Sequence, residues 1–227
     1  MLAMLLACSV VLAGFAAARW LSARLGHPPW ASPVLVTAVA IIAGLAATGL
    51  SLANFQIATA PLRWLLGPAL VALALVIDGN RSLLRAQAVP VLVAVVGGAL
   101  VGLGSAVALA RLLGIDGVLA AALVTKTVTT PFTVAIMTRV DGPVALAAAL
   151  SVLTGVIGAL LVPPVFARLK VKDPAARALG LGVSAHIVGT DWLTRRDARG
   201  GGLAALAFVV TGLVAALVVP LAWHWLS

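Results

Sequence analysis

The chain has 227 residues, of which 63% are hydrophobic and only 9% are charged. Soluble domains carry about 25% charged residues, so this composition excludes an ordinary soluble domain and indicates an integral membrane protein. The net charge of +9 comes from Lys and Arg in short loops between apolar runs. That pattern indicates contact with an anionic lipid surface rather than with nucleic acid.

The N-terminal residues 1–18 are apolar, and their basic residues follow the run instead of preceding it. A signal peptide has the opposite order, so we expect a first transmembrane helix there. Cys8 is the one cysteine of the sequence, which excludes an intramolecular disulfide and a metal site built from several cysteines. The sequence predicts no metal site and no cofactor.

Seven further apolar segments follow, and a membrane span needs roughly 20 residues. Five of them are long enough to cross a bilayer, whereas residues 62–77 and 176–193 are short and interrupted. The first of these two carries Gly67 and Pro68, and the second carries Ser184, His186 and Gly189. The seven segments are 32–52, 62–77, 88–110, 117–138, 143–166, 176–193 and 202–226.

The two short segments occupy matching places in two halves of the chain. Paired short or Gly/Pro-interrupted segments point to the binding site of a transporter. We therefore predict an all-α polytopic membrane protein with about six transmembrane helices and two broken or re-entrant elements in an inverted repeat. The expected parts are a peripheral helix 1–30, a first repeat 32–113, a connecting helix 117–140 with a break, and a second repeat 143–226.

The distribution of Lys and Arg supports this topology over one with eight full crossings. If 62–77 and 176–193 enter and leave on the same side, the basic residues divide 10 to 4 between the two sides, with both termini outside. In that arrangement Arg85 and Arg199 lie on opposite sides. The four on the minority side are Arg63, Arg81, Arg85 and Arg139.

Small residues suit close helix approach at Gly98-x-x-x-Gly102 and at Gly155-x-x-Gly158. Packing within the chain and a homodimer face are both open as explanations of these two motifs.

Lys126 lies within the apolar segment 117–138 and directly before Thr127-Val128-Thr129-Thr130-Pro131. A cation at bilayer depth costs roughly 2.5 to 3.5 kcal/mol on insertion scales, so it usually meets an ion or a substrate. We expect Thr130 to be the N-cap of a new half-helix with Pro131 in its first position. The half-helix would then point its positive end at an anion.

Several of these segments resemble the LrgB/CidB family of bacterial membrane proteins, once described as holin-antiholin proteins or murein hydrolase regulators. The family also includes the carboxy-terminal half of the plant plastidial glycolate/glycerate translocator. The resemblance covers about residues 30–226, in family order. It rests on 127–131, on Ala185-His186-Ile187-Val188-Gly189-Thr190, and on the stretches 66–69, 154–159 and 173–182.

The resemblance implies transport of small monocarboxylates such as pyruvate, glycolate or glycerate across the bacterial inner membrane. It also implies a small LrgA/CidA-type membrane partner. The sequence departs from the family pattern at Asp191-Trp192 and in the basic, glycine-rich loop that follows. These departures bear on the identity of the substrate near segment 176–193.

A small carboxylate needs donors and positive potential, and these residue types supply both. We expect His186 to contribute a donor or to carry a coupled proton. The expected substrate-binding residues are Lys126, Thr127, Thr129, Thr130, Pro131, Gly67, Pro68, Ser184, His186, Gly189 and Thr190.

Structural explanations of the same residues stay open. Lys126 can extend toward the membrane surface or pair with Asp116 or Asp191. The Thr-Thr-Pro can be a packed kink, and His186 can be a buried, hydrogen-bonded side chain. The spacing favours no enzyme, because no nucleophile-base-acid set and no phosphate loop is found. The alternative function is a holin-like or antiholin-like pore, or a regulator of murein hydrolase activity.

Overall fold

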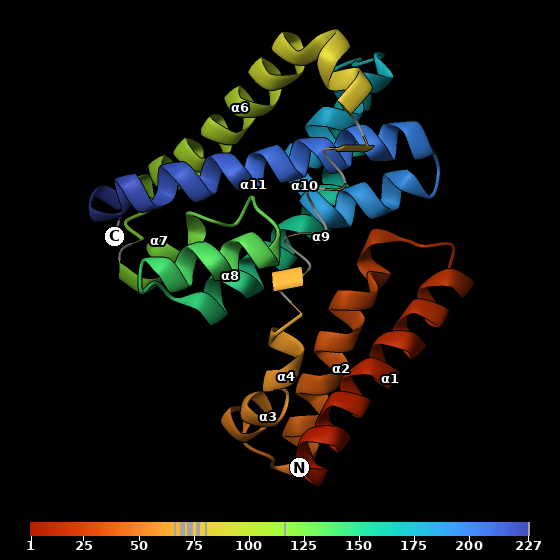
Figure 1. Cartoon of the computed structure of the whole chain (residues 1–227), viewed down its shortest axis with the longest axis vertical. Helices are drawn as coiled ribbons and strands as arrows, with labels where there is room; N and C mark the ends of the chain where they lie inside the picture. The colour runs from red at the N-terminus through yellow and green to blue at the C-terminus, as the bar shows by residue number, and fades with distance from the viewer. Residues whose placement is uncertain are drawn as a thin grey trace. The chain divides into compact units, whose positions relative to one another are not determined.

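The computed structural model describes residues 1–65, 67–68, 71, 75, 78–79, 81–115 and 117–226. For residues 83–87 and 224–226 only the backbone is described. The described part consists of helices joined by turns and loops, with no β-strand (Figure 1). It divides into two compact units, 1–71 and 72–227, and each is described separately.

The first unit contains α1 (Leu2–Arg24), a 3-10 turn (Pro29–Ala31), α2 (Pro33–Thr48), α3 (Leu52–Ala58) and α4 (Ala60–Arg63). Helix α1 is long and apolar enough to cross a membrane, and α2 is a shorter apolar helix. Proline in the first turn starts α2, where its missing N–H is not needed. An apolar cavity of about 600 Å³ lies among α1, α2 and α3.

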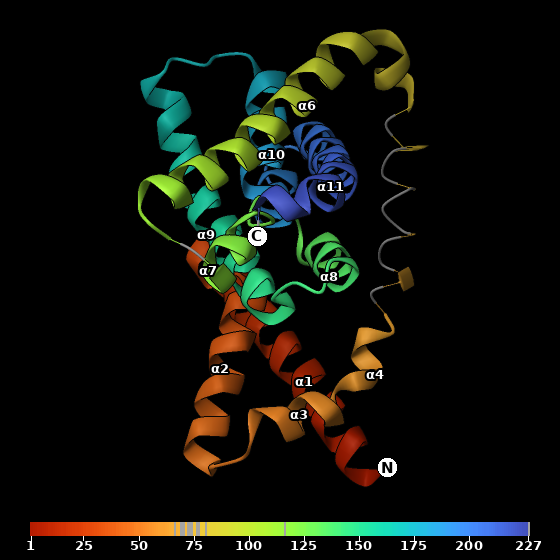
Figure 2. The same ribbon diagram turned by 90° about the vertical axis from the view of Figure 1, so that its left-hand side faces the viewer.

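The second unit contains α6 (Arg81–Leu112), α7 (Gly117–Leu123), α8 (Thr130–Arg139), α9 (Val144–Arg168), α10 (Pro174–Thr194) and α11 (Ala198–Leu226). By length and composition α6, α9 and α11 can each cross a membrane. Helix α10 packs against both α9 and α11 (Figure 2). With α1, these are four candidate spans among the described residues, so the prediction of an all-α polytopic membrane protein is confirmed.

The α7–α8 segment enters and leaves at one end of the second unit. Near the end of α6, Arg111 lines a cavity together with Ala222, close to the C-terminal end of α11. After α8, Gly142 lies against the Trp223 ring, at the same end of α11. The chain therefore leaves the α7–α8 segment at the same end of the unit where it entered.

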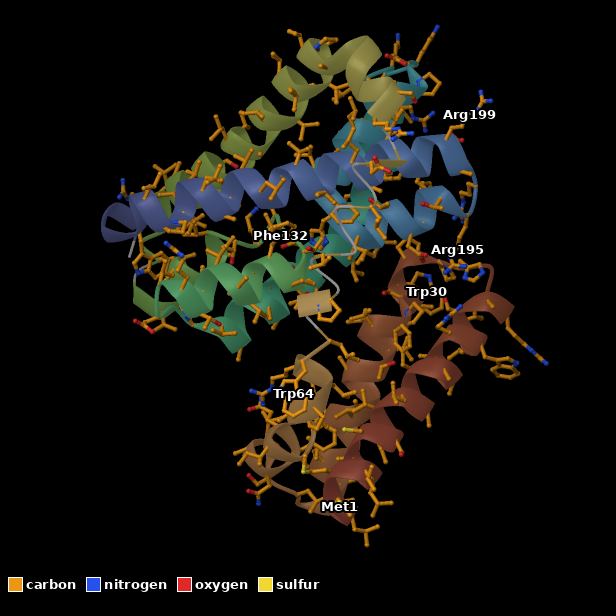
Figure 3. The ribbon with its side chains drawn as sticks, viewed as in Figure 1. Met1, Trp30, Trp64, Phe132, Arg195 and Arg199 are labelled. Carbon is orange, nitrogen blue, oxygen red and sulfur yellow. The ribbon has the colours of Figure 1, made fainter. Side chains whose placement is uncertain are left out.

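The middle of this segment reaches deep into the unit. Phe132, which is labelled in Figure 3, belongs to the first turn of α8. Its ring lies directly against Gly212 of α11. Gly212 is 11 residues before Trp223 in α11, a rise of roughly 16 Å along the helix axis. Residues 117–139 therefore form a re-entrant hairpin, which we call the α7–α8 hairpin.

The expectation that 117–138 crosses the membrane is therefore wrong. Helices α7 and α8 have 7 and 10 residues, so each extends only roughly 10 to 15 Å, about half of a hydrocarbon core. The hydroxyl-rich residues between them do not continue the helix, and the chain turns back at that point. Half of the segment 62–77, expected to be re-entrant, lies outside the described residues, so that expectation stays a prediction.

Helix α10 also folds back on itself, at His186, where the backbone has φ 37° and ψ −129°. A Cβ on Gly189 would lie 3.0 Å from the Leu181 side chain, although eight residues of straight helix rise roughly 12 Å. Arg177 and Arg196, near the two ends of the element, line a common cavity. The expectation that 176–193 is re-entrant fits this geometry, and we call the element the α10 hairpin.

The two hairpins enter the unit from opposite ends. Helices α6 and α11 run in the same direction, because Val91 and Val95 pack with Leu206 and Ala207 while Arg111 lies near the other end of α11. Helix α9 runs in the opposite direction. The α7–α8 hairpin enters at the end of the unit where α6 ends, and the α10 hairpin enters at the end where α9 ends. Residues 81–139 and 144–194 thus have inverted topologies, whereas the expected repeat boundaries, 32–113 and 143–226, stay a prediction.

Basic residues are concentrated at one end of this unit, where α6 and α11 begin and the α10 hairpin has its base. Arg85 and Arg199 both belong to this end, so the expectation that they lie on opposite sides is wrong. The error comes from the assignment of 117–138 as a membrane crossing, because one extra crossing places every later segment on the opposite side of the membrane. Arg111 and Arg139 lie at the other end. The residues of the basic end are Arg81, Arg85, Arg168, Lys170, Lys172, Arg177, Arg195, Arg196 and Arg199.

Candidate functional site

The tip of the α7–α8 hairpin is the six-residue segment 124–129 between the two helices. Thr129 is the N-cap residue of α8, with φ −67° and ψ 151°, so the helix begins one residue earlier than expected and Pro131 is in its second position. The single hydrogen of the Thr133 hydroxyl is shared between the carbonyls of Thr125 (3.2 Å) and Val128 (3.4 Å). These bonds satisfy carbonyl oxygens that a continuous helix would have paired internally.

The tip of the α10 hairpin is His186, whose side chain is 2% exposed. Its Nε2 lies 2.9 Å from the carbonyl oxygen of Ser151 in α9. A carbonyl only accepts, so Nε2 carries the hydrogen, and in a neutral imidazole Nδ1 is then an acceptor. Nδ1 is buried and has no hydrogen-bond partner in the described structure.

Ser151 connects the two tips. Its carbonyl accepts from His186, and its hydroxyl donates to the Val128 carbonyl at 2.5 Å. The Ser151 side chain is fully buried. One residue of α9 is therefore hydrogen-bonded to both helix breaks.

The glycines of α9 make room for the α10 hairpin. A Cβ on Gly155 would lie 2.5 Å from His186 Cε1, and a Cβ on Gly158 would lie 2.9 Å from the Ala185 Cβ. Ser151, Gly155 and Gly158 are spaced i, i+4 and i+7, so they share one face of α9. Close approach at this face lets an imidazole reach a backbone carbonyl of the neighbouring helix.

The glycines of α6 face the same two elements. A Cβ on Gly98 would lie 3.2 Å from Val183 of the α10 hairpin, and one on Gly102 would lie 3.4 Å from the Thr127 methyl. The Gly98-x-x-x-Gly102 motif therefore serves packing within the chain. Val183 of the α10 hairpin and Thr127 of the α7–α8 tip therefore lie beside α6 about one helical turn apart.

Five buried polar atoms around the two tips have no hydrogen-bond partner in the described part of the chain. A buried hydroxyl without a partner costs roughly 1–3 kcal/mol, so such atoms rarely persist without a water or a ligand. Their clustering at two helix breaks indicates a site for a small polar molecule. The atoms are Oγ1 of Thr125, Thr127, Thr129 and Thr190, and Nδ1 of His186.

Lys126 belongs to the same tip and is partly exposed. Its ammonium group makes no hydrogen bond or ion pair with any described residue. Asp191, one of its two expected structural partners, instead binds Arg195 through two contacts of 3.0 Å. Asp116, the other, lies outside the described residues.

The remaining expected site residues are placed less directly. The Ser184 hydroxyl donates to the Gly180 carbonyl at 2.6 Å, and Gly189 packs against Leu181 within the hairpin. Thr130 and Pro131 form the first turn of α8. Gly67 and Pro68 belong to the first unit, so their role at this site stays a prediction.

Sequence reasoning missed Ser151 and Thr125. Thr125 precedes Lys126 and belongs to the same hydroxyl-rich stretch. Ser151 was detectable as the polar residue one turn before the Gly155-x-x-Gly158 pair, on the helix face that these glycines define. Among the described residues, no group of three or more His, Cys, Asp and Glu side chains is placed to hold a metal ion.

Residues 11–225 match the model of the LrgB-like family, and the chain belongs to this family. No solved structure matches it. The resemblance drawn from the sequence motifs is thereby confirmed.

Three relatives show the range of the similarity. The chain is 29% identical to the uncharacterized protein YxaC of Bacillus subtilis (strain 168) over 71% of this chain and 70% of that protein. It is 28% identical to plastidal glycolate/glycerate translocator 1 of Arabidopsis thaliana over 67% of this chain and 30% of the translocator. It is 24% identical to the antiholin-like protein LrgB of B. subtilis (strain 168) over 83% of this chain and 82% of that protein.

Proposed function

We propose that this protein carries small monocarboxylates of the pyruvate, glycolate or glycerate type across the bacterial inner membrane, together with a proton. The observation that carries the proposal is the meeting of two oppositely inserted hairpins at Ser151, with five unpartnered buried polar atoms around their tips. Carriers place discontinuous helices near the bilayer midplane, where they bind substrate.

The α7–α8 tip has the chemistry of an anion site. Thr127 and Thr129 have hydroxyls with no other partner, and Lys126 supplies a full positive charge. The first N–H groups of α8 point out of its N-terminus, which favours negative charge. Together these groups replace the water that a carboxylate loses on entering the site.

The α10 tip favours an acid that arrives with a proton. With Nε2–H bound to the Ser151 carbonyl, neutral His186 presents only an acceptor at Nδ1. A carboxylate is also only an acceptor, so the two meet only if one proton lies between them. Whether the carboxyl or the imidazole holds that proton, one acid and one proton enter together.

The inverted hairpins support alternating access. Withdrawal of one hairpin from Ser151 would open the site toward one end of the unit, and withdrawal of the other toward the opposite end. By the positive-inside rule, the basic end of the second unit faces the cytoplasm. The α10 hairpin then governs access from the cytoplasm, and the α7–α8 hairpin governs access from outside.

The names of the relatives support two candidate activities. The name of the Arabidopsis relative supports transport of glycolate and glycerate, although the match covers only 30% of that protein. The antiholin-like relative aligns over most of both chains, which supports a pore or a regulator of cell lysis as the second candidate. The unpartnered polar atoms gather around the two helix breaks, which favours the carrier, since a wide pore needs polar faces along several helices.

We also propose two protein partners. The antiholin-like relative makes a small LrgA/CidA-type membrane protein a natural companion of this chain. The second proposed partner is another copy of this chain, bound through a surface other than the glycine motifs, which pack within the chain.

The test is uptake of labelled glycolate, glycerate and pyruvate by liposomes that contain the purified protein. Wild type should give saturable uptake with no leakage of a trapped dye. Lys126→Ala should lower uptake at least a hundredfold, because the charge that offsets the carboxylate is lost. Lys172→Ala removes an exposed lysine of the α9–α10 loop and should leave uptake near the wild-type rate.

Two results would count against the carrier. Wild-type uptake by a correctly folded Lys126→Ala variant would remove the lysine from the site. Unselective dye release that is insensitive to added acid would support the pore instead.

A further inference from the structure

A second cavity, of about 280 Å³, lies at the base of the α10 hairpin and is separate from the hairpin tips. Its inner wall is apolar and comes from the end of α9 and from both arms of the hairpin. Its rim is charged. The wall includes Pro163, Phe166, Leu181, Trp192 and Leu193, and the rim comprises Arg177, Arg196 and Asp197.

The two rim arginines come from opposite arms of the hairpin. Arg177 is exposed and lies in the first turns of α10, and its guanidinium makes no hydrogen bond or ion pair with a described residue. Arg196 follows the second arm, where it donates to the Trp192 carbonyl (2.9 Å) and its Cζ lies 4.3 Å from the centre of the Trp192 ring. A guanidinium has five N–H donors, so both arginines have donors left for an external anion.

The acidic rim residue is already engaged. One oxygen of Asp197 accepts from the Arg199 backbone N–H at 3.0 Å, in the first turn of α11, where a negative charge is favoured by the helix N-terminus. Asp191 is paired with Arg195. The charge that the cavity offers to a ligand is therefore positive.

We propose that this cavity binds an anionic phospholipid from the cytoplasmic leaflet. Arg177 and Arg196 bind the phosphodiester, and the apolar wall takes the first part of an acyl chain. Arginine suits this role because its planar donors match phosphate oxygens. The cavity lies at the basic end of the unit, where anionic headgroups face the protein.

The size and position of the cavity favour a lipid over a soluble anion. Complete small-molecule sites enclose roughly 300–1,000 Å³, so about 280 Å³ with exposed rim residues suits one portion of a larger molecule. A free phosphate would leave the apolar wall unused. Trp192, in the wall, is of a residue type that is enriched at the membrane interface.

Binding would join the two arms of the hairpin at its base. The phosphodiester would bridge Arg177 on the first arm and Arg196 after the second, and thereby stabilise the folded-back arrangement. This inference does not depend on the transport proposal, since it concerns binding and stability only.

The experiment is native mass spectrometry of the purified, delipidated protein with phosphatidylglycerol, phosphatidylcholine or inorganic phosphate added, together with melting curves followed by tryptophan fluorescence. Wild type should retain phosphatidylglycerol with at least tenfold preference over phosphatidylcholine and melt at a higher temperature with it. Arg177→Gln/Arg196→Gln should weaken this retention about a hundredfold, since each charged contact is worth about a tenfold change.

The matched control is Arg168→Gln/Lys172→Gln, which removes two positive charges from the same end but outside the cavity. It should retain the lipid within about threefold of wild type. Equal weakening by both double variants would overturn the proposal in favour of general surface charge. Equal retention of phosphatidylcholine by wild type, or full competition by inorganic phosphate, would overturn it as well.

Discussion

The α7–α8 hairpin and the α10 hairpin reverse the chain in different ways. The first turns over six residues between Leu123 and Thr130 and leaves three threonine hydroxyls without a partner among the described residues. The second turns at His186, whose φ of 37° lies in the left-handed region. Such a conformation costs a non-glycine residue on the order of 1–3 kcal/mol unless its surroundings enforce it.

The two hairpins also differ in how they contact the neighbouring helices. The α10 hairpin is packed tightly, since a Cβ on Gly182 would overlap the Ala204 backbone of α11. The α7–α8 hairpin meets α6 more loosely, with 3.4 Å between a Cβ on Gly102 and the Thr127 methyl. The α10 hairpin is therefore positioned by direct backbone contact with α11, whereas the α7–α8 hairpin is held by side-chain contacts, with Thr127 against Gly102 and Phe132 against Gly212.

The largest expected effect on stability is that of Gly182→Ala. The added methyl group would meet the Ala204 carbonyl and Cα, and two backbones cannot separate by a side-chain rotation. We expect a loss of roughly 3 kcal/mol or more in the free energy of unfolding. Melting of the purified protein in detergent measures it.

The control is Gly102→Ala, which places the same methyl group in ordinary van der Waals contact with Thr127. It should change stability by less than about 1 kcal/mol. Equal destabilisation by the two substitutions would remove the difference between the hairpins on which the comparison rests.

Much of this architecture could be predicted from the sequence, because its signals are local. The charge of Lys126 and the missing N–H of Pro131 marked the break between α7 and α8. The glycines and the polar residues of 176–193 marked the second element. Helix-length apolar runs marked α6, α9 and α11.

The pairing of the hairpins could not be predicted in the same way. Residues 117–138 are long enough to cross a membrane if the break is treated as a kink, and nothing local distinguishes a kink from a reversal. The distinction lies in tertiary contacts, such as Phe132 against Gly212. Ser151 was missed for the same reason, since its two partners are 23 and 35 residues distant in the sequence.

The next largest effect concerns the coupling of acid to proton. If His186 Nδ1 binds the acid only together with a proton, each turnover moves no net charge. Glycolate uptake by wild-type liposomes should then be unaffected by a potassium diffusion potential and should rise several-fold when the outside is made acidic.

In His186→Gln the side-chain amide can donate to a carboxylate without a proton. Any residual uptake should therefore become sensitive to the diffusion potential. Strongly potential-driven uptake by the wild-type protein would contradict coupling through His186, whatever the variant does.

The smallest expected effect is that of Ser151→Ala. The substitution removes the hydroxyl that donates to the Val128 carbonyl at 2.5 Å and keeps the carbonyl that His186 uses. One lost hydrogen bond should lower stability by about 1 kcal/mol. Hydrogen exchange should rise at 124–129 and stay unchanged around His186. An equal rise at both tips would show that Ser151 does not connect them through two separable bonds.

The central claim, that two hairpins enter the unit from opposite ends, is tested most directly by side-specific cysteine labelling in intact cells. Single cysteines in a Cys8→Ser background would be placed at Leu113, Asp141, Arg81 and Arg199. The account predicts that Leu113 and Asp141 are both labelled from outside, although 117–138 lies between them, and that Arg81 and Arg199 are both labelled only from the cytoplasm. Labelling of Leu113 and Asp141 from opposite sides would contradict it.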